Sequence, residues 1–242
     1  MQSQNSLNLS NGIFFKLKSS FKKLYKNSNF YEKRISKTFD NNFEYKPSPH
    51  LLSSIIKYQK KKYKIEDFAT ESIWQNNISS KDFKKLNNFF WFFSLDLKSS
   101  KETTQSIILN WINKNEKFDE NIWEFNITAK RIIAWLSNHQ LTYEDSNEEY
   151  RLFFNHMLQK QTNHLLNEIK NLDETEEKLI GCAAIILTGL AYKDEKNYLD
   201  SGLNILKNLI KHSLDKQGFP KSRNIQNLVF YLKYLIIIRE WF

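Results

Sequence analysis

The sequence predicts an all-α protein built from helical hairpins, and three observations support this fold class. The 242 residues include only five Gly and three Pro, which leaves little material for the tight turns of β-hairpins. Apolar residues make up 40% of the chain, and from residue 79 onward they recur at helical spacing. The first helices of successive pairs start near residues 80, 127, 174 and 224. A repeating unit of roughly 47 to 50 residues without strands is typical of stacked helical pairs.

Each expected helix follows from apolar periodicity or from a start signal. Pro47 and Pro49 end a mixed segment, so the first helix of the body is expected at about 50–62. Three helices follow from apolar stripes, at about 80–95 (Phe83, Leu86, Phe89, Phe90, Phe93), 100–114 (Ile107, Ile108, Trp111, Ile112) and 127–139 (Ile132, Ile133, Trp135, Leu136). Four more are expected at about 147–171, 174–192, 195–214 and 224–242. Ser146 with Glu149, and Asp173 with Glu176, have the spacing of capping boxes. Stacked pairs occur in open superhelices and in closed α/α toroids, and periodicity does not distinguish the two.

The net charge of +9 belongs entirely to the first 70 residues. They hold 14 Lys and Arg against 5 Asp and Glu, whereas residues 71–242 hold 22 of each. Residues 13–26 have the pattern of a basic amphipathic helix, and Lys60 to Lys62 add a second cluster. Such an arm could touch an anionic polymer or a membrane surface, or it could be a solvated extension that packs against the body. We favour the extension and predict no nucleic-acid partner, because no Arg-rich or aromatic RNA-binding motif accompanies the lysines. Residues 1–49 are therefore expected to form a basic extension and linker, and residues 50–242 the helical domain.

Targeting and redox signals are sparse. Residues 1–11 lack a charged start followed by an apolar stretch, and no run of 18 apolar residues occurs, so we predict neither a signal peptide nor a transmembrane segment. A cytoplasmic location is then the default. Cys182 is the single cysteine, which excludes an intrachain disulfide, and its setting between Gly181 and Ala183 indicates close helix packing.

The polar segment Gln217–Asn224 interrupts two apolar helices and carries the main candidate site. Ser222 supplies a hydroxyl, Arg223 a planar set of donors and Asn224 an amide. Their place at the start of a helix also favours an anion.

Five sequence segments, in order, resemble the helical N-terminal domain of heparinase II/III-like proteins, particularly their alphaproteobacterial branch. The pieces are Phe90 to Leu97 (FWFFSLDL), Trp123 with Ile127 to Leu136 (ITAKRIIAWL), Tyr150-Arg151 with the helix to Leu166, Leu187 to Leu190 (LTGL), and Gly218 to Asn224 followed by Leu235-Ile236-Ile237-Ile238-Arg239. The resemblance covers about residues 75–242. It implies an incomplete α/α toroid followed by a β-sandwich domain that is absent here. The end at Arg239 to Phe242, without a capping Gly or polar tail, fits a fragment of such a protein.

The resemblance also implies a polysaccharide lyase that acts on an acidic, uronate-containing polysaccharide, and it makes a periplasmic location an alternative. We expect no cofactor and no metal. Proton removal beside a carboxylate requires that the carboxylate be neutralised, the role expected of Arg223 and Asn224, together with a base and an acid. The positions at which the family has a Tyr-His pair are Asn227 and Leu228 here. The Asn-Asn-His of an earlier core helix is replaced by Glu176 to Lys178. The loop itself has Gln217 and Pro220 in place of the Asp and His of its branch.

For the other candidate residues, a role in the folded structure is at least as well supported as a role in binding substrate. Trp123 lies just before a helix and is a candidate sugar platform, whereas aromatic residues at helical spacing more often form the core. Arg131, on an apolar helical face, requires an anionic or carbonyl partner, which is either substrate or protein. His139 ends that helix, where a cation would also complement the helix dipole. His156 and His164 are ~12 Å apart along one helix and cannot share a metal ion.

We therefore expect Trp123, Arg131, His139 and Ser222 to bind substrate. The alternative hypothesis is a non-catalytic helical-repeat module that binds a polyanion or a protein partner.

Overall fold

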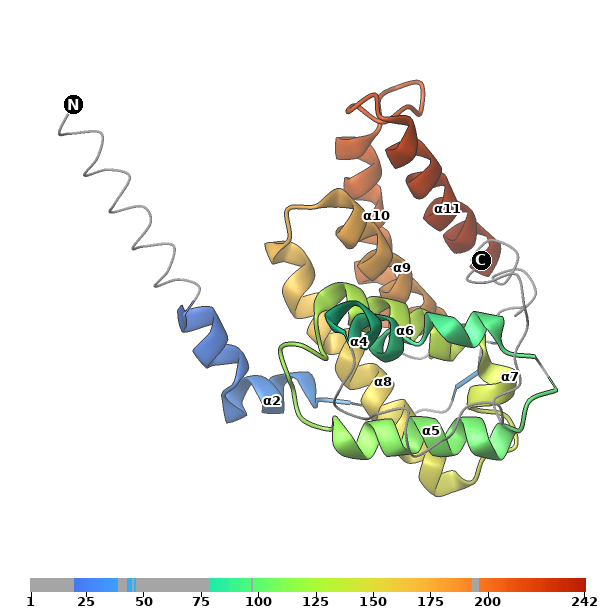
Figure 1. Cartoon of the computed structure of the whole chain (residues 1–242). Helices are drawn as coiled ribbons and strands as arrows, with labels where there is room; N and C mark the ends of the chain where they lie inside the picture. The colour runs from blue at the N-terminus through green and yellow to red at the C-terminus, as the bar shows by residue number, and fades with distance from the viewer. Residues whose placement is uncertain (1–19, 39–42, 45, 47–78, 97, 193–195) are drawn as a thin grey trace.

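The computed structural model describes residues 20–38, 43–44, 46, 79–96, 98–192 and 196–242, and these residues form an all-α structure (Figure 1). The predicted fold class is confirmed, while closure into a toroid stays a prediction. Within the described ranges the extended pairing is limited to one bridge between Leu214 and Pro220. The helices are α2 (Asn29–Ile35), α4 (Ser80–Asn87), η2 (Phe90–Ser94), α5 (Lys101–Lys114), α6 (Phe125–Ser137), α7 (His139–Thr142), α8 (Glu148–Glu168), η3 (Ile169–Asn171), α9 (Thr175–Ala191), α10 (Lys196–Ser213) and α11 (Ile225–Trp241). The helix expected at 50–62 and the cluster at Lys60 to Lys62 lie outside the described residues.

The single helix expected at 80–95 is divided in two. α4 ends at Asn87, Phe89 adopts a left-handed conformation (φ 57°), and the 3-10 helix η2 follows. The amide N–H of Phe90 donates to the Asn88 side chain, which stabilises the reversal. The reversal buries the Phe89 ring edge-on against Trp111 and Trp135. Burial of this aromatic ring offsets the free-energy cost of the left-handed backbone conformation, which is unfavourable for a bulky residue.

Both capping boxes predicted from sequence are wrong by one residue. Asn147 caps α8, and its side chain accepts from the N–H of Tyr150. The Ser146 hydroxyl instead donates to the carbonyl of Tyr143. α9 starts after Glu174, whose side chain makes no capping hydrogen bond. Asx and Ser side chains form several local backbone bonds of similar energy, so neighbouring polar residues compete for the cap position.

The apolar helix α9 is the centre of the packing and lies against α6, α8, α10 and α11. Almost every residue from Leu179 to Ala191 is buried. α9 and α10 approach closely at Gly189, where a Cβ would stand 2.4 Å from the backbone nitrogen of Leu199. A glycine is therefore required at this crossing.

The described part of the N-terminal segment belongs to the same core. Tyr31 and Ile35 of α2 are fully buried, and the Tyr31 hydroxyl lies 2.7 Å from Nδ1 of His164 on α8. The Asn163 amide donates to the carbonyls of Ile35 and Lys37 at 2.8 Å each. α2 thus packs directly on α8.

The hairpin of α10 and α11 extends from the rest of the molecule and carries its connecting loop at the far end (Figure 1). α11 buries Tyr231, Tyr234 and Ile238 against the body. Its other side carries four exposed apolar residues at spacings of four, three and four: Ile225, Val229, Leu232 and Ile236. We call this set the α11 stripe. No helix in the described part of the chain is both long and apolar enough to cross a membrane.

Gly189→Ala is expected to destabilise the chain by about 1 to 3 kcal/mol, because the added methyl group forces α9 and α10 apart. Thermal unfolding followed by circular dichroism measures the effect. Asn204→Ala, at an exposed position on α10, is the control and should melt close to the unmodified chain. Equal melting temperatures for the two variants would contradict the close approach.

Candidate functional site

The loop between α10 and α11, residues 214–224, is organised around the carboxylate of Asp215. This group accepts hydrogen bonds from the backbone N–H groups of Gln217 and Phe219 at 2.9 and 3.0 Å. It also forms an ion pair with Nη1 of Arg223 at 2.7 Å. The N–H of Phe219 and these further contacts lower the pKa of Asp215. Gly218 turns the chain with φ 83°, a conformation that glycine adopts at little cost. The loop is thus a fixed structure with an internal charge pair.

Ser222, Arg223 and Asn224 lie together in this loop, and each already serves its conformation. Arg223 adopts φ 56° and holds Asp215 through one nitrogen, while its side chain stays 66% exposed. The Asn224 side chain caps α11 by accepting from the N–H of Gln226 at 2.8 Å. The Ser222 hydroxyl accepts a longer bond, 3.4 Å, from the Asn227 amide. The Arg223 side chain thus keeps most of its surface in solvent.

The same end of the hairpin is strongly basic. Between residues 201 and 239 the chain has a single acidic residue, Asp215, and that carboxylate is paired. Four cationic side chains are exposed around the loop and define what we call the basic tip: Lys211, Lys216, Lys221 and Arg223. Nζ of Lys221 donates to the carbonyl of Lys211 at 3.0 Å, so it lies back over the end of α10. The Phe219 side chain is half exposed beside them.

Arg131 of α6 is fully buried and contacts protein groups only, which corrects its assignment as a substrate ligand. Nε donates to the Gln161 side chain at 2.6 Å, and Nη1 donates to the carbonyls of Asn87 and Ile122 at 2.8 and 3.2 Å. The guanidinium lies over the Trp111 ring, 4.1 Å from its centre. Burial lowers the pKa of the Arg131 guanidinium well below its usual range. Neutral oxygens and an aromatic face therefore replace water around this charge.

Trp123 and His139 are also interior residues. The Trp123 ring is 1% exposed and packs edge-on against His164, with centroids 5.8 Å apart. The His139 side chain is 6% exposed, and its Nε2 lies 3.4 Å from Glu144. Burial lowers the pKa of His139, and the nearby Glu144 carboxylate partly opposes this shift by favouring the charged imidazolium. These two residues contribute to the core of the described structure, and their burial leaves little surface with which to bind a substrate.

The candidate residues therefore do not share one site. Ser222, Arg223 and Asn224 lie at the end of the α10–α11 hairpin, whereas Arg131 lies on α6 in the body (Figure 1). In the described structure these four residues therefore lie in two separate places.

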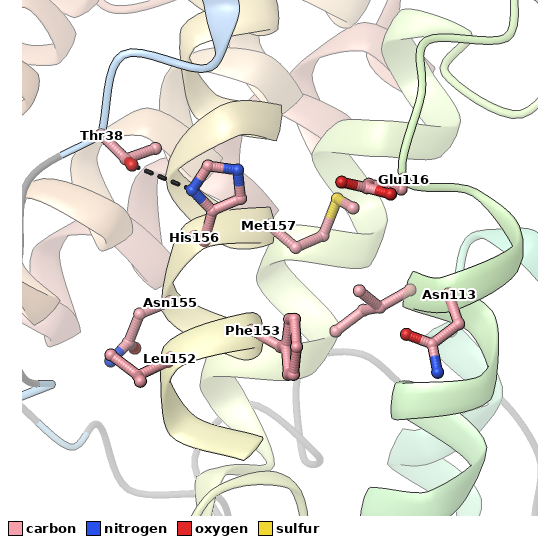
Figure 2. Close-up of a pocket in the computed structure, with 9 residues that line it drawn as sticks. Thr38, Asn113, Glu116, Leu152, Phe153, Asn155, His156 and Met157 are labelled. Atoms are coloured by element: carbon pink, nitrogen blue, oxygen red, sulfur yellow. Dashed lines mark hydrogen bonds between the residues drawn. The ribbon is translucent and has the colours of Figure 1, made fainter. Parts of the chain in front are cut away.

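A pocket of about 520 Å³ on a different surface was not predicted from the sequence (Figure 2). α5 and α8 form its walls, and Thr38 stands at one edge with its hydroxyl 3.0 Å from Nδ1 of His156. Burial lowers the pKa of His156 from its ordinary value. Glu116 faces it across the pocket with Met157 between them. Sequence reasoning considered His156 only as a metal ligand, and its partner Thr38 lies 118 residues away.

Among the described residues, no three His, Cys, Asp or Glu side chains gather in a group that could hold a metal ion. Comparison of the chain with protein-family models, curated proteins and solved structures gives no match.

Arg131→Met is expected to destabilise folding by about 3 kcal/mol or more. The variant leaves two buried carbonyl oxygens and a buried amide without their donor, at about 1 to 3 kcal/mol each. Urea denaturation measures the loss, with the exposed Arg223→Met as the matched control. A stable, folded Arg131→Met chain would show that the buried charge is dispensable.

The buried His164 is expected to lower the free energy of unfolding as the pH falls. Burial lowers its pKa to about 3, while in the unfolded chain it titrates near ~6.5. Between these two pKa values the unfolded chain binds a proton at His164 that the folded chain does not. The contribution of His164 to the free energy of unfolding is therefore fully present above about pH 6.5 and decreases as the pH falls. From about pH 7 to pH 5 the loss from this group is about 2 kcal/mol. Urea midpoints across this range test it, and His164→Gln should show a shallower slope. Equal slopes in the two chains would mean that His164 titrates normally.

Proposed function

We propose that this chain is the helical domain of a heparinase II/III-like protein and that it binds an acidic, uronate-containing polysaccharide at the basic tip. The observation that carries the proposal is the group of exposed cations around the α10–α11 loop, where the single carboxylate is already paired with Arg223. A polymer with a carboxylate on each sugar, or on alternate sugars, presents charges at regular intervals. Such a ligand gains from several weak contacts at once, as no single exposed ion pair is strong.

The chemistry of the tip suits a sugar acid in two further respects. Arg223 keeps most of its guanidinium in solvent, and a guanidinium binds a carboxylate through two parallel hydrogen bonds. The exposed Phe219 ring offers an apolar face on which a pyranose ring can lie. Support for the family comes from the five ordered sequence segments and from the position of this loop between two long helices.

The activity implied by the resemblance is β-elimination, in which Arg223 and Asn224 would neutralise the substrate carboxylate. A base and an acid are then required beside the loop, and the positions expected to supply them are Asn227 and Leu228. Neither side chain transfers protons near neutral pH. This observation favours a second candidate function, a non-catalytic module that binds the same polyanion through the basic tip.

Replacing three lysines of the tip, in the variant Lys211→Gln, Lys216→Gln and Lys221→Gln, should weaken binding of polygalacturonate about tenfold, since each exposed pair contributes up to ~1 kcal/mol. The Asp215–Arg223 pair is left intact in this variant. Isothermal titration calorimetry measures the affinity. The matched control, Lys98→Gln, Lys114→Gln and Lys117→Gln, removes the same charge from exposed positions elsewhere. Equal weakening in the two triple variants, or equal affinity for a neutral glucan, would refute the site.

The two candidate functions differ in the product. A lyase generates an unsaturated uronate that absorbs in the ultraviolet, whereas a binding module leaves the polymer unchanged. Binding without absorbance from the folded chain supports the non-catalytic module. Absorbance that is lost in Arg223→Ala supports elimination.

A further inference from the structure

An exposed apolar surface lies at the N-terminal side of the molecule. Residues 20–26 are helical, and Phe21, Leu24 and Tyr25 share one face of this helix by their spacing. Phe21 and Leu24 are 69% and 68% exposed. Phe30, at the start of α2, is 69% exposed, and its ring centre lies 6.2 Å from that of Tyr25. We call these four residues the N-terminal apolar patch.

The patch faces outward because the other edge of the helix is tied to the body by charge. Nζ of Lys22 and of Lys26 lie 3.0 and 2.5 Å from the Glu168 carboxylate on α8. Lys26 also lies over the Phe118 ring, 5.9 Å from its centre. This orientation is the reverse of the usual one, in which an amphipathic helix packs its apolar face inward. Large apolar side chains that gather in water usually mark an interaction surface.

The rim of the patch is cationic. Lys33, Arg34 and Lys37 are exposed and follow Phe30 at intervals of three, four and seven residues, which places them on its side of α2 or just beyond its end. Nη1 of Arg34 donates to the Tyr25 hydroxyl at 3.3 Å, which joins the cationic rim to the apolar residues.

The acidic residues of this segment do not neutralise the rim. Glu32 is the single acid within residues 20–38, and its carboxylate is bound by the buried ammonium group of Lys160 on the body. The outward side of the segment thus combines exposed apolar side chains with cations that its own acidic residue does not pair.

We propose that the N-terminal apolar patch docks the chain onto the surface of an anionic phospholipid bilayer. Phe21, Leu24 and Phe30 enter the boundary between headgroups and acyl chains, while the cations of the rim contact the lipid phosphates and carboxylates. Interfacial helices combine these two features, apolar insertion and attraction to anionic lipid. Nucleic acids bind through phosphate contacts and base stacking, and Leu24 at the centre of the patch offers neither.

The docking surface lies well apart from the basic tip. In Figure 1 the helical residues from 20 onward and α2 lie at the lower left of the molecule. The α10–α11 loop lies at the top, at the end of its hairpin that points away from the body. Attachment to a bilayer therefore leaves the basic tip accessible, and the two proposals can fail independently.

Co-sedimentation with vesicles tests the proposal, using phosphatidylcholine alone or mixed with phosphatidylserine. The chain should bind the mixed vesicles and not the neutral ones. The variant Phe21→Ser, Leu24→Ser and Phe30→Ser should reduce this binding by roughly tenfold or more. The variant Lys33→Gln, Arg34→Gln and Lys37→Gln should also reduce it and remove much of its salt dependence. The matched apolar control, Ile225→Ser, Val229→Ser and Leu232→Ser on α11, should bind as the unmodified chain does.

Three outcomes would overturn the proposal: no binding to the anionic vesicles, equal loss in the α11 control, or loss in the cation variant with full binding by the apolar variant. The last outcome would indicate a soluble polyanion such as RNA as the ligand. Circular dichroism confirms that each variant is folded.

A fluorescent label gives a second measurement on the folded chain. Cys182 is fully buried, and burial raises its thiol pKa to about 12, so an added surface cysteine is labelled selectively. An environment-sensitive dye on Leu24→Cys should shift to shorter emission wavelength with anionic vesicles, while the dye on Asn204→Cys should not. An unchanged spectrum at position 24 would mean that the patch stays in water.

Discussion

The solvation of the buried Arg131 charge is the constraint on which the surrounding elements depend. Its acceptors come from four separate places: the end of α4, the segment before α6, α6 itself and α8. A guanidinium removed from water is tolerated only when oxygen atoms surround it at hydrogen-bonding distance. The backbone at Asn87 is fixed further because its side chain accepts from the Trp111 indole at 2.9 Å. The position of each of these elements is therefore specified by the need to solvate one charge, in addition to apolar packing.

Most helices could be predicted from the sequence because each buries a regular apolar stripe. α5 and α9 through α11 begin and end within about two residues of the predicted bounds, and the helix predicted at about 147–171 corresponds to α8 followed by η3. The reversal at Phe89 could not be predicted, since a left-handed Phe is locally unfavourable and is stabilised by rings that are distant in sequence. The start of α8 was missed for a local reason, as Ser146 and Asn147 are both good caps and only the geometry selects between them.

Only part of the candidate site could be predicted from the sequence. Ser222, Arg223 and Asn224 lie together because they are adjacent in sequence, but the role of Asp215 in organising the loop depends on turn geometry that spacing does not reveal. Arg131 was a candidate because helical periodicity identifies an inward face without indicating whether that face meets a cleft or the core. Trp123 and His139 were candidates for their places just before and at the end of the same helix, which do not reveal burial either. The N-terminal segment illustrates the same limit. It was expected to pack against the body, but which of its sides would do so depends on ion pairs with Glu168, more than 140 residues away.

The α11 stripe has a consequence for how the chain behaves in bulk. α11 is apolar on nearly every side, and such helices are normally enclosed. One side is enclosed by α9, whereas the other presents Ile225, Val229, Leu232 and Ile236 to solvent at the spacing of a coiled-coil seam. Contact between two such surfaces in solution buries apolar area and favours association, and the associated fraction grows with the concentration of the chain. The stripe thus sets an upper limit on the concentration at which the molecules remain dispersed, and the positive net charge of the chain opposes that limit by mutual repulsion.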